Sequence, residues 1–391
     1  MRRAHVVCSI IPPHIYRHIA EHGADDDRRR ARLALEASAH TRGQREAVAG
    51  MRAFVQAAAE TGRRRAIYDA KRKRALPGKL VRAEGDKATG DKAADEAYDG
   101  SGKTYDFYSK VYDRNSIDGR GLRIDSSVHY SVDFSNAQWN GRQMLYGDGD
   151  GTLFNRFTSS LDVIGHELTH GVTQYSAALE YHDQPGALNE HFSDVFGILV
   201  KQYSLKQTAK KSDWLIGAGI FTPRVHAVAV RSMKAPGTAY DDPTIGRDPQ
   251  PAHMKNLVKT HDDSGGVHIN SGIPNHAFYL LATALGGNAW DVAGKIWYVT
   301  LTQKLRHDAR FQQCADATFS VAGELQGRGS EPQNAVAAAW KAVGIEISPK
   351  VVAGETRLPI RRPRPVIPAF EPAIGGAEVP SDAGRPTRVA T

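Results

Sequence analysis

Residues 161–193 read LDVIGHELTHGVTQYSAALEYHDQPGALNEHFS, and this stretch predicts the centre of the fold. Its first half carries apolar side chains three and four positions apart, the period of an amphipathic helix, at Val163, Ile164, Leu168 and Val172. No proline interrupts the stretch before Pro185. We therefore expect one helix here, a break at Pro185-Gly186, and a second helix from about Ala187 onward.

The first helix presents two histidines with metal-ligand spacing. His166 and His170 are four residues apart, so their imidazoles share one helix face. Zinc accepts such nitrogens and requires a third protein ligand together with one open position. Glu167 directly follows the first histidine and is placed to take a proton from water there. Because the chain has 16 histidines, the motif alone also has an accidental interpretation.

The second helix supplies a candidate for the third ligand. Glu190 and Asp194 are four residues apart on it, in the apolar company of Phe192 and Leu199. A carboxylate buried among such side chains is costly unless it is paired. We expect Glu190 to complete the zinc site and Asp194 to accept the spare ring N–H of a ligand histidine. In the alternative interpretation both are solvated carboxylates beside a surface histidine.

Composition and charge exclude several classes of protein. The chain has 391 residues, 41% of them hydrophobic and 24% charged, which is typical of a soluble globular protein. It contains no run of 18 apolar residues, so we expect no membrane span. The net charge of +8 comes partly from basic clusters at residues 28–32, 63–65 and 71–74. We expect solvated helix faces and linkers there, and no nucleic-acid binding, because neither stacking aromatic residues nor a recognition fold accompanies them.

The two cysteines, Cys8 and Cys314, are too few and too distant in sequence for a disulfide framework. A single bridge has no supporting pattern. Cys8 has two interpretations: a thiolate that reaches the zinc ion from the N-terminal segment, or a buried apolar thiol. We prefer the buried thiol.

The flanking regions differ from the centre. Residues 1–50 contain the extended stretch IIPPHIY and then two short helical pieces. Residues 51–61 favour an alanine-rich helix, and a charged loop follows as far as Asp99. Short strands are indicated around residues 122–132, 136–141, 144–146 and 226–233. The strand that carries Asn136 and Ala137 is either an edge that pairs with an extended peptide or an ordinary hairpin strand.

The C-terminal part is expected to be helical, with helices from Pro274 and over residues 289–303, 311–325 and 332–343. Upstream of them, His268 follows a pair of glycines, and Asp263 lies five residues before it. On its own such a histidine is more often a bystander; beside a metal site it becomes a donor to a developing oxyanion. From residue 348 onward the density of proline predicts an extended, disordered tail.

These motifs together resemble the thermolysin family of zinc endopeptidases. HELTH, GALNEHFSD, RSM at Arg231 and DDSGGVHINSGIPN occur in the order and at the intervals of that family, over about residues 105–343. IIPPHIY resembles the short pro-segment of its protealysin branch. The resemblance implies an α+β fold with the active-site cleft between two lobes. We expect a pro-segment (1–50), a β-rich N-terminal lobe (51–175), a helical C-terminal lobe (176–347) and a Pro-rich tail (348–391).

The resemblance also implies roles for individual residues. His166, His170 and Glu190 match the zinc ligands, Glu167 the general base and Asp194 the partner of a ligand histidine. The transition state would be stabilised by three side chains: His268, Asp263, which orients it, and Tyr181. Arg231 would bind a substrate carbonyl and brace Glu190 or its surroundings.

Further positions match the substrate-binding groups of the family. The groups that hold the substrate backbone would be Asn136, Ala137, Trp139 and, on the opposite side, Asn189. The pocket beyond the scissile bond would be formed by six apolar residues: Phe154, Phe157, Val163, Ile216, Ile220 and Val230. We therefore expect cleavage on the amino side of bulky hydrophobic residues, with Leu or Phe favoured.

The chain departs from the family at the expected calcium site. Asp162 and Asp213 are present, but Lys201, Leu215 and Ala218 stand where further calcium-binding carboxylates are expected. A lysine in a carboxylate cage opposes a divalent cation. We expect the double calcium site to be absent and stability to depend less on calcium.

The leading hypothesis is a monomeric zinc endopeptidase that acts on proteins or peptides and is made as a precursor. Its own pro-segment would be its partner in cis, removed near residue 50. We expect secretion, although the first twenty residues make a poor Sec signal peptide; the alternative is a cytoplasmic enzyme. The second hypothesis is a proteolytically silent, zinc-stabilised binding protein. The third is a nucleic-acid binder, whose retention on DNA would be salt-sensitive.

Overall fold

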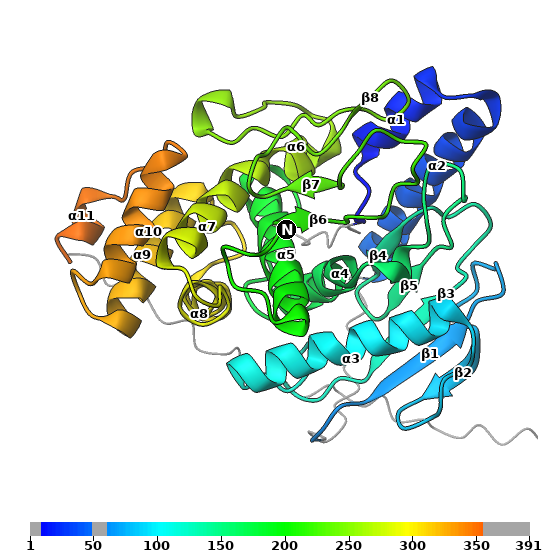
Figure 1. Cartoon of the computed structure of the whole chain (residues 1–391), viewed down its shortest axis with the longest axis horizontal. Coiled ribbons are helices and arrows are strands. Elements are labelled where there is room, and N and C mark those ends of the chain that lie inside the picture. The colour runs from blue at the N-terminus through cyan, green and yellow to red at the C-terminus, as the bar shows by residue number, and fades with distance from the viewer. Residues whose placement is uncertain (1–8, 49–60, 355–391) are drawn as a thin grey trace, which may run out of the picture.

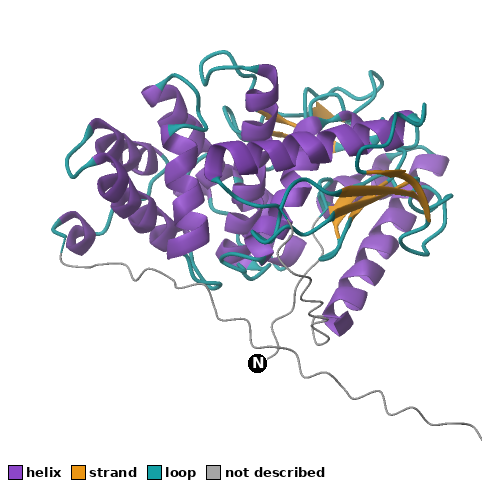
Figure 2. Cartoon of the chain, turned by 90° about the horizontal axis from the view of Figure 1, so that it is seen from below, coloured by secondary structure: helices purple, strands orange, loops and turns teal. Residues whose placement is uncertain are grey.

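A computed structural model describes residues 9–48 and 61–354 of the chain (Figure 1). Seen from below, the strands gather at one end of the molecule and helices fill the other (Figure 2). This arrangement confirms the expected α+β class, with a sheet-containing N-terminal part and a helical C-terminal part. Cys8, part of the expected helix at residues 51–61 and the tail beyond residue 354 lie outside the described residues.

The helices are α1 (Pro13–His22), α2 (Asp25–Val48), α3 (Lys92–Tyr112), α4 (Leu161–Gln174), α5 (Asp183–Leu205), α6 (Asp263–Asn270), α7 (Gly272–Leu285), α8 (Val292–Val299), α9 (Phe311–Gln326), α10 (Glu331–Ala342) and α11 (Pro349–Val352). Two short 3₁₀ segments (Phe157–Ser159 and Met254–Asn256) and a π-helical turn (Thr300–Lys304) accompany them. The strands are β1 (Arg65–Asp69), β2 (Lys79–Ala83), β3 (Ile124–Val128), β4 (Ala137–Trp139), β5 (Met144–Tyr146), β6 (Leu215–Ile216), β7 (Arg231–Ser232), β8 (Asp241–Asp242) and β9 (Gly246–Arg247).

The main sheet has the strand order β2-β1-β3-β5-β4, which leaves β4 at one edge. β1, β3 and β5 run parallel to one another, while β2 and β4 pair antiparallel with their neighbours. An edge strand exposes backbone groups that an extended peptide can pair with. In this structure the backbone at Ile10 lies against that edge, because Ile10 N donates to Ala137 O at 3.2 Å.

Helices α4 and α5 pack together at the centre of the molecule, and glycines allow their close approach (Figure 1). A Cβ atom on Gly165 would lie 3.1 Å from Gly197 Cα. A Cβ atom on Gly197 would lie 2.6 Å from the backbone oxygen of Asp162 and 3.0 Å from His166 N. Any side chain at either position would push apart the two helices that carry the candidate ligands.

The expected break at Pro185-Gly186 is wrong. Helix α5 begins at Asp183, and Pro185 lies in its first turn. A proline there removes no helical hydrogen bond, because the first N–H groups of a helix have no acceptor within it. Helix α5 therefore starts four residues earlier than about Ala187, while Glu190 and Asp194 stay on the predicted face.

The expected charged loop before Asp99 is interrupted by regular structure, and the basic cluster at residues 63–65 is not solvated throughout, whereas the cluster at residues 71–74 is exposed as expected. β1 and β2 lie in this region, and α3 already begins at Lys92. Arg65 is only 4% exposed; its guanidinium hydrogen-bonds Glu84 at 2.6 and 2.7 Å and lies 3.5 Å above the Tyr98 ring. A residue of a charge run with a nearby carboxylate and aromatic ring can thus be buried in an interior strand of the sheet.

Three smaller expectations need correction. The second helical piece of the N-terminal segment is not short, since α2 runs from Asp25 to Val48. Its first turn consists of three acidic residues, which favour a helix N-terminus. The strand expected at residues 226–233 shrinks to the two residues of β7. The tail begins with the short helix α11, and Pro349 is its first residue, a position where proline is favourable.

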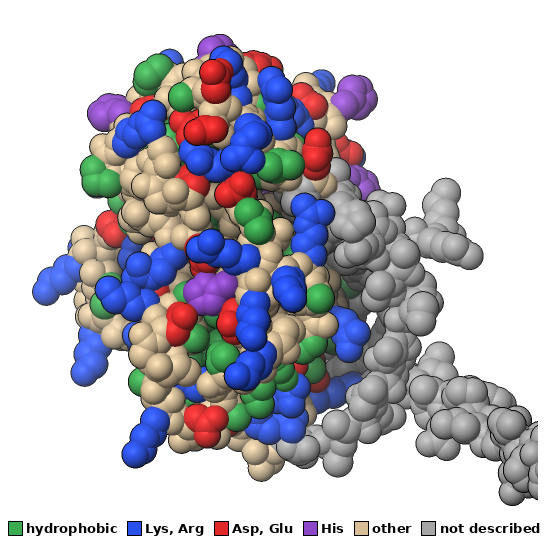
Figure 3. Space-filling view, turned by 90° about the vertical axis from the view of Figure 1, so that its right-hand side faces the viewer, with side chains coloured by type: hydrophobic (Ala, Val, Ile, Leu, Met, Phe, Trp, Pro, Cys, Tyr) green, Lys and Arg blue, Asp and Glu red, His purple; other side chains and the backbone are tan. Residues whose placement is uncertain are grey.

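The surface mixes both charges (Figure 3), and Lys and Arg side chains are interspersed with Asp and Glu. On α2, Arg30 pairs with Asp27 at 2.6 Å and Arg29 lies 3.6 Å from Asp133. Within the described ranges, no helix combines the length and the apolar character needed to cross a membrane.

Candidate metal centre

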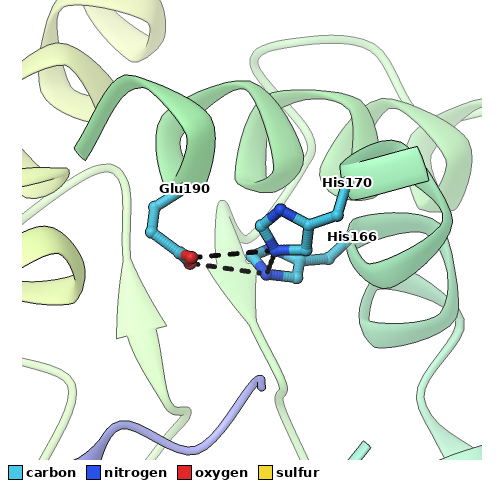
Figure 4. A group of neighbouring side chains, drawn as sticks. All are labelled: His166, His170 and Glu190. Atoms are coloured by element: carbon cyan, nitrogen blue, oxygen red, sulfur yellow. Dashed lines mark hydrogen bonds and ion pairs between the residues drawn. The ribbon is translucent and has the colours of Figure 1, made fainter. Parts of the chain in front are cut away.

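Three buried side chains from two helices converge on one point (Figure 4). His166 and His170 project from α4 and Glu190 from α5, and their ligand atoms all lie within 4.8 Å of one another. His166 Nε2 is 3.5 Å from Glu190 Oε2, and His170 Nε2 is 3.7 Å from Glu190 Oε1. The three residues predicted as zinc ligands are therefore brought together.

Hydrogen bonds on the far side of each imidazole fix which nitrogen faces this point as an acceptor. His166 Nδ1 lies 2.8 Å from Asp194 Oδ1, and a carboxylate only accepts, so the proton is on Nδ1. His170 Nδ1 lies 2.8 Å from Asn189 Oδ1, and Asn189 Nδ2 donates to Leu179 O, which fixes the amide orientation.

Both Nε2 atoms thus present lone pairs, yet they are 3.0 Å apart. Two lone pairs at that separation repel each other unless a cation lies between them. Two neutral imidazoles and a carboxylate form the donor set that zinc prefers at catalytic sites. The residues present therefore fit a zinc ion.

The carboxylate of Asp194 bonds His166 and other buried side chains on the side of His166 that faces away from Glu190. This carboxylate receives Arg231 Nε at 2.9 Å and Arg231 Nη2 at 2.8 Å, as well as the His166 N–H. Burial opposes the charge of Asp194, but Arg231 and His166 outweigh it and hold its pKa well below the usual range. Arg231 therefore braces Asp194 directly, and through its charge it also helps to lower the pKa of Glu190.

Glu167 is fully buried on α4 and joins the site to the sheet edge. Its Oε2 accepts the backbone N–H of Trp139 at 2.9 Å. Trp139 belongs to β4, the strand that pairs with the pro-segment. The carboxylate therefore lies between the helix that carries the histidines and the strand that receives an extended peptide.

Tyr181, His268 and Asp263 gather on the α6 side of the site. The Tyr181 hydroxyl donates to Glu190 Oε1 and lies 3.2 Å from His268 Nε2. Asp263 accepts from His268 twice, at Nδ1 (2.6 Å) and at the backbone N (2.8 Å). Burial opposes protonation of His268, but Asp263 and Glu190 outweigh it and raise its pKa. Gly265 and Gly266, with φ of 86° and 75°, form the turn that brings Asp263 to this histidine.

The groups expected to bind a substrate backbone hold the pro-segment in this structure. Asn136 Oδ1 accepts Ile11 N at 3.1 Å, and Asn136 Nδ2 lies 3.4 Å from Ile11 O. Arg231 Nη1 donates to Ile10 O at 3.1 Å. The backbone of Ile10 and Ile11 thus lies against the start of β4 and contacts the arginine that braces Asp194.

The predicted pocket residues lie in one buried region. All six are at most 2% exposed: Phe154, Phe157, Val163, Ile216, Ile220 and Val230. The Phe154 ring lies 5.9 Å from the ring of Tyr16, a residue of α1 in the pro-segment. The pro-segment therefore packs on the apolar wall as well as on the backbone-binding edge.

The side chain of Asn189 bonds His170 and Leu179, and its expected contact with the substrate stays a prediction. Three residues behind Asp194 were not predicted from the sequence: Asn275, His191 and Trp297. Asn275 falls within the motif around His268, but no spacing rule connects it to a residue 81 positions earlier. Cys314 is a buried free thiol, and burial raises its pKa. The preference for a buried thiol concerned Cys8, which lies outside the described residues.

Lys201 lies among the oxygen atoms of the expected calcium site. Its Nζ is 3.0 and 3.1 Å from the two carboxylate oxygens of Asp213, 3.3 Å from Leu215 O and 3.7 Å from Asp162 Oδ2. Asp162 Oδ2 also accepts the N–H of Gly217 at 2.9 Å. The ammonium group therefore connects α4, α5 and the loop around β6.

Comparisons with known proteins agree with this geometry. Residues 54–174 match the family model "Thermolysin metallopeptidase, catalytic domain" and residues 177–345 match "Thermolysin metallopeptidase, alpha-helical domain". Residues 8–37 match "Protealysin propeptide".

Individual relatives cover most of the chain. It is 48% identical to the extracellular metalloprotease of Pectobacterium carotovorum subsp. carotovorum, over 87% of this chain and 97% of that protein. It is 41% identical to a thermolysin of Bacillus caldolyticus, over 71% of this chain and 50% of the relative. The solved precursor of protealysin from Serratia proteamaculans superposes with a TM-score of 0.79 at 50% identity, covering 86% of this chain and 99% of that one.

Proposed function

This chain belongs to the thermolysin family of metallopeptidases, and on that premise we propose how its site hydrolyses peptide bonds. The chain is the precursor form of a neutral metalloendopeptidase, with its pro-segment in cis. One observation carries the proposal: three buried donors converge, with both imidazole lone pairs aimed at one point, beside an edge strand that hydrogen-bonds a segment of peptide backbone.

His166, His170 and Glu190 would hold the zinc ion. When bound, zinc polarises the scissile carbonyl and makes water a better nucleophile at neutral pH. Asp194 keeps the His166 proton on Nδ1, and Asn189 does the same for His170, so that both Nε2 atoms remain available as ligands.

Glu167 would act as the general base. Its hydrogen bond to Trp139 N fixes its position relative to the strand that aligns the peptide. The proton acceptor and the scissile bond are therefore held in a defined position relative to each other. Glu167 takes the proton of the attacking water and returns it to the leaving amine. A positioned acid–base group of this kind contributes about 10²- to 10⁴-fold in rate.

His268 and Tyr181 would donate to the oxygen on which negative charge develops. Asp263 orients the His268 ring and, together with Glu190, favours its protonated form. In comparable sites one such donor is worth about 3–4 kcal/mol of transition-state stabilisation.

Substrate recognition would use the contacts that the pro-segment makes. Asn136 and Ala137 bind the peptide backbone through β4, and Arg231 receives a carbonyl oxygen as it receives Ile10 O. The apolar wall that includes Phe154, Ile216 and Val230 favours cleavage on the amino side of Leu or Phe.

The pro-segment therefore occupies the substrate-binding edge, and we propose that its removal near residue 50 opens the cleft. Secretion is part of the same proposal, supported by relatives that are named extracellular proteases. We also propose that the Lys201 ammonium takes the place of a calcium ion between Asp162 and Asp213.

The test compares Glu167→Gln with Glu324→Gln, a surface carboxylate paired with Lys304 far along the chain. Both proteins are loaded with zinc, freed of the pro-segment by the same added protease and assayed on casein. We expect at least a ~100-fold loss of hydrolysis for Glu167→Gln and no loss for Glu324→Gln. Undiminished hydrolysis by Glu167→Gln would remove the proposed base. Inactivity of the zinc-loaded parent would favour a silent binding protein.

A further inference from the structure

A continuous chain of buried hydrogen bonds extends from Asp194 into the helical C-terminal part of the molecule. Trp297 Nε1 donates to His191 Nε2 at 2.7 Å. His191 Nδ1 lies 2.8 Å from Asn275 Oδ1, and Asn275 Nδ2 donates to Asp194 Oδ2 at 2.8 Å. Asp194 in turn holds His166 Nδ1. Trp297, His191, Asn275 and Asp194 come from α8, α5, α7 and α5, and all are at most 1% exposed.

We propose that Trp297 is a positioning residue that, through His191 and Asn275, fixes the orientation of Asp194 and hence of the metal ligand His166. This inference rests on the proposed zinc site and deepens it. The four hydrogen bonds are referred to below as the Trp297 chain.

The direction of each bond in the Trp297 chain follows from its first member. An indole N–H can only donate, so His191 Nε2 must accept and its proton must be on Nδ1. Nδ1–H then donates to the amide oxygen of Asn275, which turns the amide nitrogen toward Asp194. The indole donor at one end and the Asp194 carboxylate at the other therefore select the same histidine tautomer and the same amide orientation.

The far end of the Trp297 chain matters because Asn275 supplies a neutral donor to Asp194 Oδ2. Arg231 supplies both carboxylate oxygens with a charged donor, and Asn275 adds the second bond to Oδ2. Without the indole N–H, His191 Nε2 loses its buried donor, and the imidazole ring is no longer held at that end. Asn275 then bonds to a less firmly positioned ring, which loosens its alignment with Asp194 and hence the contact of Asp194 with His166.

The molecule contains a matched control for the packing role of Trp297. Trp340 is also fully buried and stacks on Trp297, with ring centroids 6.2 Å apart and planes 5° apart. Its Nε1 donates to Thr318 Oγ1 at 2.8 Å, and Thr318 in turn bonds backbone oxygens of α9. A Trp→Phe change at either position removes one buried indole donor and the same volume, but only Trp297 leads to His166.

The experiment measures zinc affinity rather than activity. The full chain with Glu167→Gln, which prevents self-digestion, is titrated against a competing chelator, alone and with Trp297→Phe, Trp340→Phe or Asn275→Leu. We expect Trp297→Phe and Asn275→Leu to weaken zinc binding about 10-fold, at the lower end of the range for residues behind a metal ligand. Trp340→Phe should stay within about 2-fold of the parent, as expected for a site that does not share the network.

A cycle of mutations distinguishes the Trp297 chain from general loosening of the core. In the Asn275→Leu background the chain is already cut, so Trp297→Phe should cause no further loss of zinc affinity. Equal losses for Trp297→Phe and Trp340→Phe would overturn the inference, as would full additivity in the cycle. If Trp297→Phe does not fold, unchanged affinity of Asn275→Leu overturns it instead. Failure of the parent itself to bind zinc would refute the underlying zinc site.

Discussion

Acidification should loosen the pro-segment from the rest of the molecule, because His14 is bound there in its neutral form. His14 is on α1, and its Nε2 lies 2.8 Å from the Tyr240 hydroxyl. Burial lowers its pKa from 6.5 to about 4; Asp263 opposes this shift, and the charges of His268, Arg17 and Arg231 add to it.

The sign and size of the effect follow from that shift. Once α1 separates, His14 returns to an ordinary pKa of about 6.5 and binds a proton more readily than in the docked state. Docking is therefore fully stable above pH ~6.5, weakens by about 1.4 kcal/mol per unit as the pH falls toward 4, and changes no further below that. The total loss is at most about 3 kcal/mol, since His14 keeps part of its surface in contact with solvent.

Amide hydrogen exchange measures this loss. In the zinc-loaded Glu167→Gln chain, protection factors corrected for intrinsic exchange should fall in α1 by up to about 10-fold per pH unit below pH 6. Those of α10 should hardly change. His14→Gln retains a hydrogen-bonding side chain but cannot take up a proton, so its α1 should lose most of the acid dependence. The same acid dependence in His14→Gln and in the parent would refute the reasoning.

Three further predictions concern the surroundings of the metal centre. Lys201→Met leaves the Asp162 and Asp213 carboxylates without their cation and should lower the free energy of unfolding by about 1–2 kcal/mol. Added calcium should restore this loss, which thermal unfolding with and without calcium measures. A loss that calcium does not restore would contradict the prediction. Gly197→Ala places a Cβ atom 2.6 Å from the Asp162 backbone oxygen and should destabilise the chain by about 1–3 kcal/mol with weaker zinc binding, measured by denaturant unfolding and chelator competition. Arg231→Lys loses the bidentate hydrogen bonds to Asp194 and should lower kcat/KM about 100-fold. A change below about 3-fold would show that a single positive charge is enough to hold Asp194 in place.

The metal ligands could be predicted from the sequence because their geometry is local. Two histidines four residues apart share a face of any α-helix, and the same spacing joins Glu190 to Asp194. Bringing the two pairs together required only that both helices bury their apolar faces against each other. The glycines at 165 and 197 then set how closely they approach.

The remainder depends on contacts that no local pattern encodes. β1 and β2 are short and rich in charge, and Arg65 is buried only because Glu84 and Tyr98 meet it in the folded sheet. The bond between Asn189 on α5 and His170 on α4 joins two helices across 19 residues. Trp297 reaches His191 across 106 residues, a separation that neither periodicity nor spacing describes.

The most direct test of the central claim is a crystal of the zinc-loaded chain measured at the zinc absorption edge. We expect one strong anomalous peak between His166 Nε2, His170 Nε2 and the Glu190 carboxylate, and its loss when His170 is replaced by alanine. A peak at any other position, or none between these three side chains, would contradict the assignment of the metal centre.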